Sequence, residues 1–112
     1  MKDNVKGGAL TEVTFYILLS LYCPRHGYAV MQFIEEKTNG RLTLGAGTLY
    51  GALNTLLKKG WIAPKDASEP GKHKIKRKKE YLITSLGKEI AEKELCRLKK
   101  LVITAEEIIT LS

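Results

Sequence analysis

The sequence GAGTLYGALNTLLKKGW, at residues 45–61, gives the strongest indication of the fold. Its leucines recur with the period of an α-helix, so the stretch predicts a helix from about Gly47 to Lys59. Gly60 is suited to end this helix in the left-handed conformation, and Trp61 then folds back on Leu56 as an ordinary apolar contact. The leucines of the buried face are spaced i, i+4, i+7 and i+8: Leu49, Leu53, Leu56 and Leu57.

The opposite face of this helix is small and polar and carries no acidic residue. A plain solvent-facing surface in a protein with 28% charged residues would more often hold Glu and Lys, and glycine inside a helix costs about 1 kcal/mol. Glycines let a helix backbone approach DNA, hydroxyls suit phosphates, and an Asn can pair with an adenine edge. We therefore expect these residues to bind DNA: Gly47, Thr48, Tyr50, Gly51, Asn54, Thr55 and Lys58.

Two further helices are expected before the central one, at Leu10–Tyr22 and Tyr28–Thr38. Pro24 follows the first and Asn39-Gly40 the second, and both are typical helix stops. The alternating segment Leu42–Leu44 predicts a short edge strand. The first helix also has a second apolar face that one small domain cannot easily bury, so we expect a partner subunit to cover Phe15, Leu19 and Tyr22.

After the central helix, strands at 62–67 and 75–83 are expected to form a β-hairpin, because Glu69-Pro70-Gly71 suits a tight turn. The second arm and the tip carry six cations and no acid within the eight residues 72–79. Such a run is typical of a phosphate-binding surface, and an ordinary solvated loop is the alternative. The cations are Lys72, Lys74, Lys76, Arg77, Lys78 and Lys79.

The composition indicates a basic protein of a single domain. The 112 residues leave no room for a second independent core. Lys and Arg number 19 against 12 Asp and Glu, which gives a formal net charge of +7. Residues 61–84 alone carry 7 basic and 3 acidic side chains. The excess positive charge therefore lies around the predicted hairpin, as expected of a nucleic-acid-binding protein.

The last segment, Ser85–Ser112, predicts one long helix with Thr84 as its N-cap. At 1.5 Å per residue it would span roughly 40 Å, which is longer than a domain of this size needs. Its apolar residues follow a 4-3-4-3-4 spacing, the pattern of a seam that packs on another helix. The mixture of Glu and Lys around the seam argues against a membrane-surface helix. The expected seam consists of Ala91, Leu95, Leu98, Val102, Ala105 and Ile109.

Three helices followed by a β-hairpin describe a winged helix-turn-helix, so the expected fold class is mainly α with a small β-hairpin (α+β). Residues 1–84 would form the DNA-binding region and residues 85–112 the dimerisation helix, within one compact domain. We therefore expect double-stranded DNA as the partner of a homodimer. A winged helix that binds only protein, or that binds RNA, is the alternative.

The sequence offers no catalytic group, metal site or cofactor site. Cys23 and Cys96 stand 73 positions apart without metal-ligand spacing, so we expect reduced, buried thiols. Neither His26 nor His73 is accompanied by a nucleophile or a paired carboxylate with which it could form a catalytic site. The longest apolar stretch, Phe15–Cys23, is far below the roughly 20 residues of a membrane-spanning helix. We expect no membrane partner and a cytoplasmic location.

Several of these motifs together resemble the PadR-like family of transcriptional regulators. The resemblance lies in His26-Gly27-Tyr28, in residues 45–50 (GAGTLY), in residues 59–62 (KGWI) and in Tyr81-x-Ile83-Thr84-x-x-Gly87. It extends from Leu10 to about Leu101. The Gly-Thr-Leu-Tyr motif and the downstream Tyr-x-Ile-Thr motif are specific in combination.

The resemblance implies a homodimeric winged-helix repressor, in which the last helix of each subunit packs on the first helix of the other. The short C-terminal region is similar to the compact branch of the family, which has a single dimerisation helix. Some members bind flat aromatic effectors between these helices, so a small apolar effector is a candidate ligand. Leu86–Leu111 has no aromatic residue to stack on such a ligand, which leaves Phe15, Tyr16 and Tyr22 as candidate lining.

Overall fold

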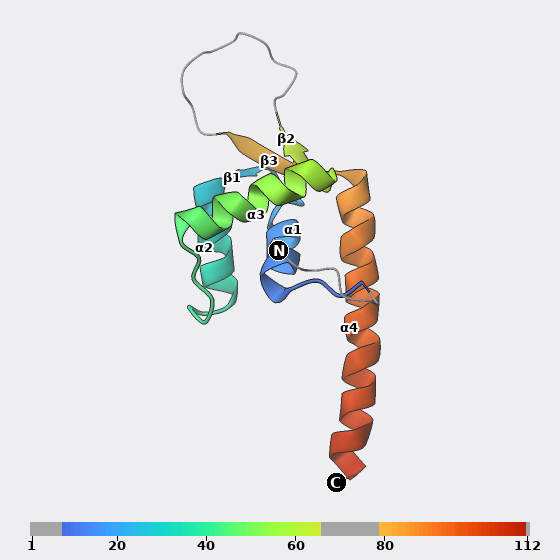
Figure 1. Ribbon diagram of the computed structural model, residues 1–112. Helices are drawn as coiled ribbons and strands as arrows, with labels where there is room; N and C mark the ends of the chain where they lie inside the picture. The colour runs from blue at the N-terminus through green and yellow to red at the C-terminus, as the bar shows by residue number, and fades with distance from the viewer. Residues whose placement is uncertain (1–7, 66–78, 112) are drawn as a thin grey trace.

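The computed structural model describes residues 8–65 and 79–111, which form helices around a small antiparallel sheet (Figure 1). The order of elements confirms the expected mainly α, winged helix-turn-helix fold. Along the chain they are α1 (Glu12–Ser20), β1 (Arg25–His26), α2 (Gly27–Lys37), α3 (Ala46–Lys59), β2 (Ile62–Pro64), β3 (Glu80–Ile83) and α4 (Ser85–Leu111).

The sheet has the strand order β1-β3-β2, and both pairs are antiparallel. Ile62 lies opposite Ile83 in the pair expected from the hairpin. The strand expected at 42–44 is wrong, because the other edge of β3 is occupied by β1, in which Arg25 pairs with Tyr81. Leu42 and Leu44 pack half-buried against the core instead. The expected turn at 69–71 and the first part of the second arm lie outside the described residues.

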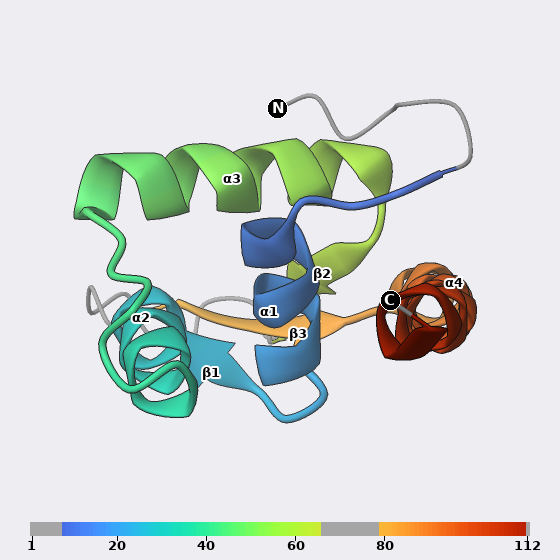
Figure 2. The same ribbon diagram turned by 90° about the horizontal axis from the view of Figure 1, so that it is seen from below.

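The core lies where α1, α2, α3 and the sheet meet. Figure 2 shows α1 at the centre of this arrangement, with α2, α3 and α4 around it. Leu49, Leu53 and Leu56 of α3 are fully buried and Leu57 is half-buried, so the predicted apolar face of the central helix is confirmed. From the other elements, the core takes Ile17, Leu18, Leu21, Val30, Ile34, Ile62, Tyr81, Ile83 and Ala91.

Two short connections fix α3 and α4 to the sheet. Gly60 ends α3 in the left-handed conformation with φ 77°, and the N–H of Trp61 donates to the carbonyl of Leu56 at 3.1 Å. Thr84 caps α4, because its Oγ1 accepts from the N–H of Gly87 at 3.0 Å, as predicted. A Cβ at Gly87 would lie 3.0 Å from the carbonyl carbon of Trp61 and closer still to its oxygen, so only glycine fits there.

The two halves of α4 have different surroundings. The first half, residues 85–97, packs against α1 and β3 of the same chain. The distal half, residues 98–111, extends away from the rest of the described chain (Figure 1). About four turns of the 27-residue helix therefore extend beyond the part of the described chain that packs around the core.

The structure corrects the expectation for the thiols. Cys23 and Cys96 are both free and exposed, because Cys23 lies in the turn after α1 and Cys96 on the outward face of α4. None of the helices in the ranges 8–65 and 79–111 has the length and apolar character needed to cross a membrane.

Candidate nucleic-acid interface

Five of the seven α3 residues expected to bind DNA lie on the side of the helix opposite the buried leucines, and Thr48 and Tyr50 flank them. Thr55 is half-buried and the others are exposed: Gly47, Thr48, Tyr50, Gly51, Asn54 and Lys58. The helix carries no acid in its first turn, and Lys58 and Lys59 lie in its last turn. The structure thus brings the predicted set onto one continuous, acid-free face, and polyanion binding is the chemistry that such a face supports.

The two glycines of this face are not required by packing inside the chain. A Cβ built on Gly47 or on Gly51 meets no atom of the described structure within 4 Å. Their backbone dihedrals are helical, so no turn requires glycine at either position. Both positions leave the helix backbone open to a close approach from outside the chain.

Tyr50 covers the N-terminal end of α2. Its ring lies so close to Gly27 that a Cβ there would be 2.6 Å from Cζ and 2.8 Å from Cε1. Burial and, to a lesser degree, the neighbouring phenol of Tyr50 raise the pKa of Tyr81. That Gly27 makes room for the Tyr50 ring was not predicted, and the His-Gly-Tyr motif was the only signal for it in the sequence.

The side chain of Thr55 is used partly within its own helix. Its hydroxyl donates to the carbonyl of Gly51 at 3.2 Å, so the proton is not free for a phosphate oxygen. Asn54 is exposed next to it and is the residue of this face best suited to contact a base edge.

The predicted wing is described only at its base. Lys65 and Glu80 form an ion pair at 3.7 Å between the two arms, and Lys59 Nζ lies 4.7 Å from the ring centroid of Trp61. Lys79 is exposed. The remaining cations of the basic run, Lys72, Lys74, Lys76, Arg77 and Lys78, lie outside the described residues.

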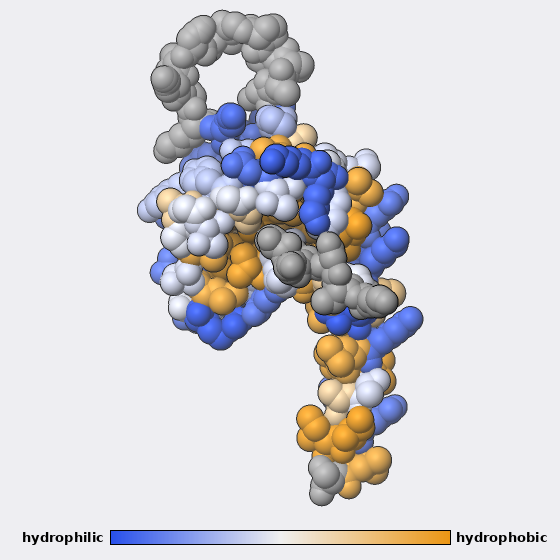
Figure 3. All heavy atoms as spheres, in the orientation of Figure 1, coloured by the Kyte–Doolittle hydropathy of each residue, from blue (hydrophilic) through white to orange (hydrophobic). Residues whose placement is uncertain are grey.

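A second exposed surface consists of apolar residues on α1 and α4, and Figure 3 shows hydrophobic residues gathered along the distal half of α4. Lys88 Nζ lies 5.6 Å from the ring of Tyr22, which joins the end of α1 to the start of α4. Leu19, Tyr22, Leu95, Val102 and Ile109 of the predicted dimer set are exposed, and Phe15, Leu98 and Ala105 are half-buried.

Ala91 does not belong with these residues. It is only 2% exposed and packs in the core of its own subunit. The helical spacing correctly predicted that Ala91 is buried, but its assignment to the dimer seam is wrong, because Ala91 packs on its own subunit. Ala91 is therefore left out of the candidate dimer surface.

Sequence reasoning also missed Glu94, which lies on the apolar face of α4 and is 3% exposed. Its carboxylate accepts two bonds from Arg97, at 2.9 and 2.6 Å, and one from the N–H of Leu10 at 3.3 Å. The signal was available, because an acid lay between Ala91 and Leu98 on the apolar stripe. The pair with Arg97 and the bond from the N–H of Leu10 together explain why the acid is tolerated, and only the bond from Leu10 depends on the tertiary structure.

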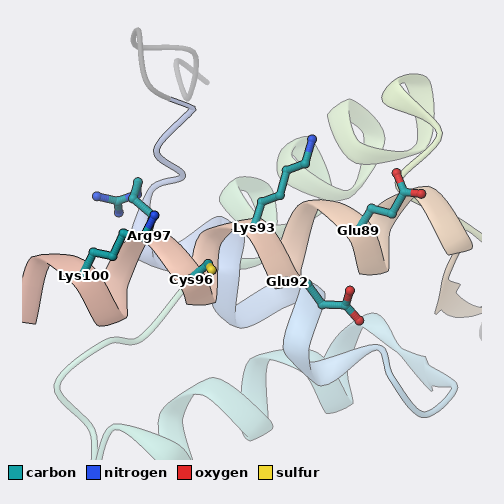
Figure 4. Close-up of a pocket in the computed structure, with 6 residues that line it drawn as sticks. All are labelled: Glu89, Glu92, Lys93, Cys96, Arg97 and Lys100. Atoms are coloured by element: carbon teal, nitrogen blue, oxygen red, sulfur yellow. The ribbon is translucent and has the colours of Figure 1, made fainter.

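The outward face of α4 has a shallow depression with charged walls (Figure 4). All of its lining comes from the one helix, so it is a surface between side chains rather than an enclosed site. The lining residues are Glu89, Glu92, Lys93, Cys96, Arg97 and Lys100. In residues 8–65 and 79–111, no group of three or more His, Cys, Asp or Glu is arranged to hold a metal ion.

Comparison with known proteins gives matches over most of the chain. Residues 17–93 match the model of the transcriptional regulator PadR-like family. The solved structure of a transcriptional regulator from Clostridium thermocellum is similar, with a TM-score of 0.66 and 28% identity over 83% of this chain and 87% of that chain. The matched residues include α3, the sheet and the start of α4.

Two curated relatives share more identity with this chain. An uncharacterized protein X of Lysinibacillus sphaericus is 32% identical over 90 residues, which are 79% of this chain and 76% of that protein. An uncharacterized 37.1 kDa protein in a transposon of Streptomyces fradiae is 36% identical over 78 residues, which are 70% of this chain. The match spans only 20% of the length of the Streptomyces protein.

Proposed function

Because this chain belongs to the PadR-like family of transcriptional regulators, which bind DNA, we propose that it is a repressor that binds an inverted-repeat operator as a homodimer. In this proposal α3 of each subunit enters the major groove of one half-site. The repeat is inverted because a two-fold dimer presents the two α3 helices in opposite directions. The half-sites lie about one helical turn, roughly 10 base pairs, or a multiple of it apart.

The observation that carries the proposal is the exposed face of α3. Its glycines have no packing role within the described chain, and its polar residues carry no negative charge. Glycine inside a helix lowers helix stability by about 1 kcal/mol relative to alanine. A close approach of the helix to a DNA groove accounts for that cost, whereas a plain solvent surface does not.

The basic run supplies the phosphate contacts in this proposal. Residues 72–79 follow β2 and lead into β3, which is the position of a wing next to the recognition helix. Each phosphate contact that is lost should reduce the magnitude of the salt slope of binding by roughly 0.9, or twice that if both subunits use the same residue. Neutralising Lys76 and Arg77 should therefore weaken binding to operator and random DNA alike.

The homodimer is supported by the exposed apolar residues of α1 and α4. The division that we propose is a DNA-binding region at residues 1–84 and a dimerisation helix at 85–112. The distal half of α4 exposes Val102, Ile108 and Ile109 to more than half of their area. Exposed apolar residues that gather on one surface are typical of a site that binds a partner protein.

We also propose that a small apolar effector releases the protein from the operator. Tyr22 is exposed beside the start of α4, where an aromatic ligand could stack. Phe15 and Tyr16 pack half-buried against the core. Titrating small aromatic compounds into the protein–operator complex and measuring dissociation tests this part separately.

Selection of binding sites from a random pool of duplex DNA tests the central proposal. We expect an inverted repeat to be enriched, and a gel shift with the selected duplex should weaken steeply as salt is raised. Placing the repeat across a promoter should lower reporter expression when the protein is present. Enrichment of a single half-site would refute the dimeric operator. Binding to single-stranded RNA but not to duplex DNA would favour the RNA-binding alternative.

A further inference from the structure

Glu94 is a buried acid whose two carboxylate oxygens accept three hydrogen bonds. Oε1 accepts from Arg97 Nε at 2.9 Å and from the N–H of Leu10 at 3.3 Å, and Oε2 accepts from Arg97 Nη2 at 2.6 Å. The fork of the guanidinium meets both oxygens, which is the most directional ion pair that side chains make. Burying a carboxylate that is only 3% exposed is costly unless it is paired and hydrogen-bonded.

The two bonds from Arg97 stay within α4, because the pair is spaced i, i+3, whereas the bond from the N–H of Leu10 joins segments 84 positions apart. Leu10 directly precedes Thr11, the N-cap of α1, so Glu94 ties the beginning of α1 to the middle of α4. Arg97 lies on the side of α4 along which the N-terminal segment passes (Figure 4). An apolar residue would continue the stripe around Ala91 and Leu98, and replacing a buried ion pair by apolar residues is often neutral or stabilising. A gain in stability therefore does not explain the charge at position 94, whereas a need for one fixed geometry between α1 and α4 does.

The second anchor of α4 lies at its N-terminus. Thr84 Oγ1 donates to the carbonyl of Gly60 at 2.7 Å, and Gly87 packs directly on the carbonyl of Trp61. From Gly87 to Glu94 the two anchors are roughly 10 Å apart along the helix, and the helix continues for about 25 Å beyond Glu94. Two anchors define the direction of a rod. Ala91 packs in the core between them, and the bond from Leu10 to Glu94 is the anchor nearer to the distal half.

We propose that Glu94 is a positioning residue, which fixes the angle between α4 and the DNA-binding region and thereby the distance between the two α3 helices of the dimer. The inference rests on the proposed function, because it requires the homodimer. A tilt of about 4° moves the end of a 25 Å rod by roughly 1.7 Å. One base pair changes the half-site separation by about 3.4 Å, so a tilt of this size in each subunit decides which spacing the dimer accepts.

The experiment measures the distance between the two α3 helices by pulsed electron–electron spin resonance. A label is attached to Lys58→Cys, at the exposed end of α3, after the exposed Cys23 and Cys96 are changed to Ser. We expect one narrow distance distribution for this parent protein. Glu94→Leu should at least double its width while the midpoint of thermal unfolding stays the same or rises. Glu94→Gln keeps an oxygen for the N–H of Leu10 and should give an intermediate width.

Glu89→Leu is the matched control, because it removes the same charge from the exposed, outward face of the same helix. Its distribution should be as narrow as that of the parent. An equally narrow distribution for Glu94→Leu, with the dimer intact, would overturn the inference and leave the proposed function standing. If Glu94→Leu does not fold, Glu94→Gln decides the question by the same criterion. If the labelled parent protein shows no spin–spin distance between two subunits, the homodimer itself is refuted.

Spacer variants of the selected operator give the functional readout. Changing the spacing of the half-sites by one base pair should weaken binding of the wild-type protein about tenfold, and binding of Glu94→Leu only about twofold to threefold. Affinity for the preferred spacing should change much less. Equal discrimination by the two proteins would contradict a positioning role for Glu94.

Discussion

The exposed face of α3 and the distal half of α4 are both helix surfaces that the described chain leaves uncovered, but their chemistry is opposite. The α3 face is small, polar and free of acids, with glycines at positions 47 and 51. The distal half of α4 exposes aliphatic side chains, and Ile109 reaches 71% exposure. The first surface therefore suits a polyanion, and the second suits the apolar surface of another protein.

On both helices, a local cost in free energy that contacts within the chain do not explain indicates what the surface binds. Glycines inside α3 weaken the helix by about 1 kcal/mol each, and aliphatic residues left in water forgo about 25 cal/mol for each Å² of apolar area. Neither cost is recovered by contacts within the described chain. Each is recovered when a partner of matching chemistry covers the surface, and the following predictions test that difference.

The largest effect is expected from Val102→Asp in the distal half of α4. Val102 is 51% exposed in the subunit, so the subunit should fold normally, whereas a dimer would bury an unpaired charge at a cost of about 3–5 kcal/mol. Sedimentation should show a monomer at concentrations where the wild-type protein is a dimer. Ile103→Asp is the control, because Ile103 is similarly exposed on the charged face of the helix. A stable Val102→Asp dimer would place the interface elsewhere.

The next effect concerns the α3 face. Asn54→Ala removes a side chain that is exposed and uncharged, so it should cost about 1–3 kcal/mol per half-site on the selected operator. Affinity for random DNA and the salt slope should stay nearly unchanged, because no phosphate contact is lost. Affinities for both DNAs across a salt titration measure this. Equal losses on both would mean that a different side of α3 reads the bases.

The next, smaller effect tests whether DNA or solvent is the neighbour of the α3 face. One substitution should raise the stability of the protein and weaken its binding to DNA. Gly51→Ala meets open space in the subunit and should raise the free energy of unfolding by about 0.5–1 kcal/mol. On the operator the added methyl group intrudes into a close contact, and this overpacking should weaken binding by about 1–3 kcal/mol. Thermal unfolding and gel shifts measure the two changes. A stabilised variant with wild-type operator affinity would show that this face is only a solvent surface.

The smallest effect is expected from Glu12→Gln, at a site in neither surface. Arg41 Nη1 donates to Glu12 Oε1 at 3.3 Å, and Nη2 contacts Oε2. The hydrogen bond from Arg41, and then its charge, hold the pKa of Glu12 below the usual value. This contribution to stability is present above the ordinary carboxyl pKa and is lost as the pH falls through the lowered pKa.

The midpoint of thermal unfolding of Glu12→Gln should accordingly be slightly below that of the wild-type protein at neutral pH, and the gap should close in acid. Because exposed ion pairs contribute little to stability, dimerisation and DNA binding should both be unchanged. A loss of either would show that the α1 end of the molecule belongs to one of the two surfaces.

Features that depend on near neighbours in the chain can be predicted from the amino-acid sequence alone. The leucine spacing defined the buried face of α3, Gly60 its end, and Thr84 the start of α4, and the structure confirms each of them. Helical periodicity and capping act over a few residues, so their signals are complete within a short window. The polar face of α3 followed from the same periodicity, although its binding to DNA stays a prediction.

Contacts between distant segments depend on the tertiary structure and could not be predicted from local patterns. The tertiary structure gave the edge of β3 to Arg25–His26 rather than to 42–44, and it buried Ala91 in the subunit's own core. It also brought Leu10 to Glu94 and Tyr50 to Gly27. A periodic pattern shows that a face is buried but not what buries it, because that depends on how the whole chain closes around the core.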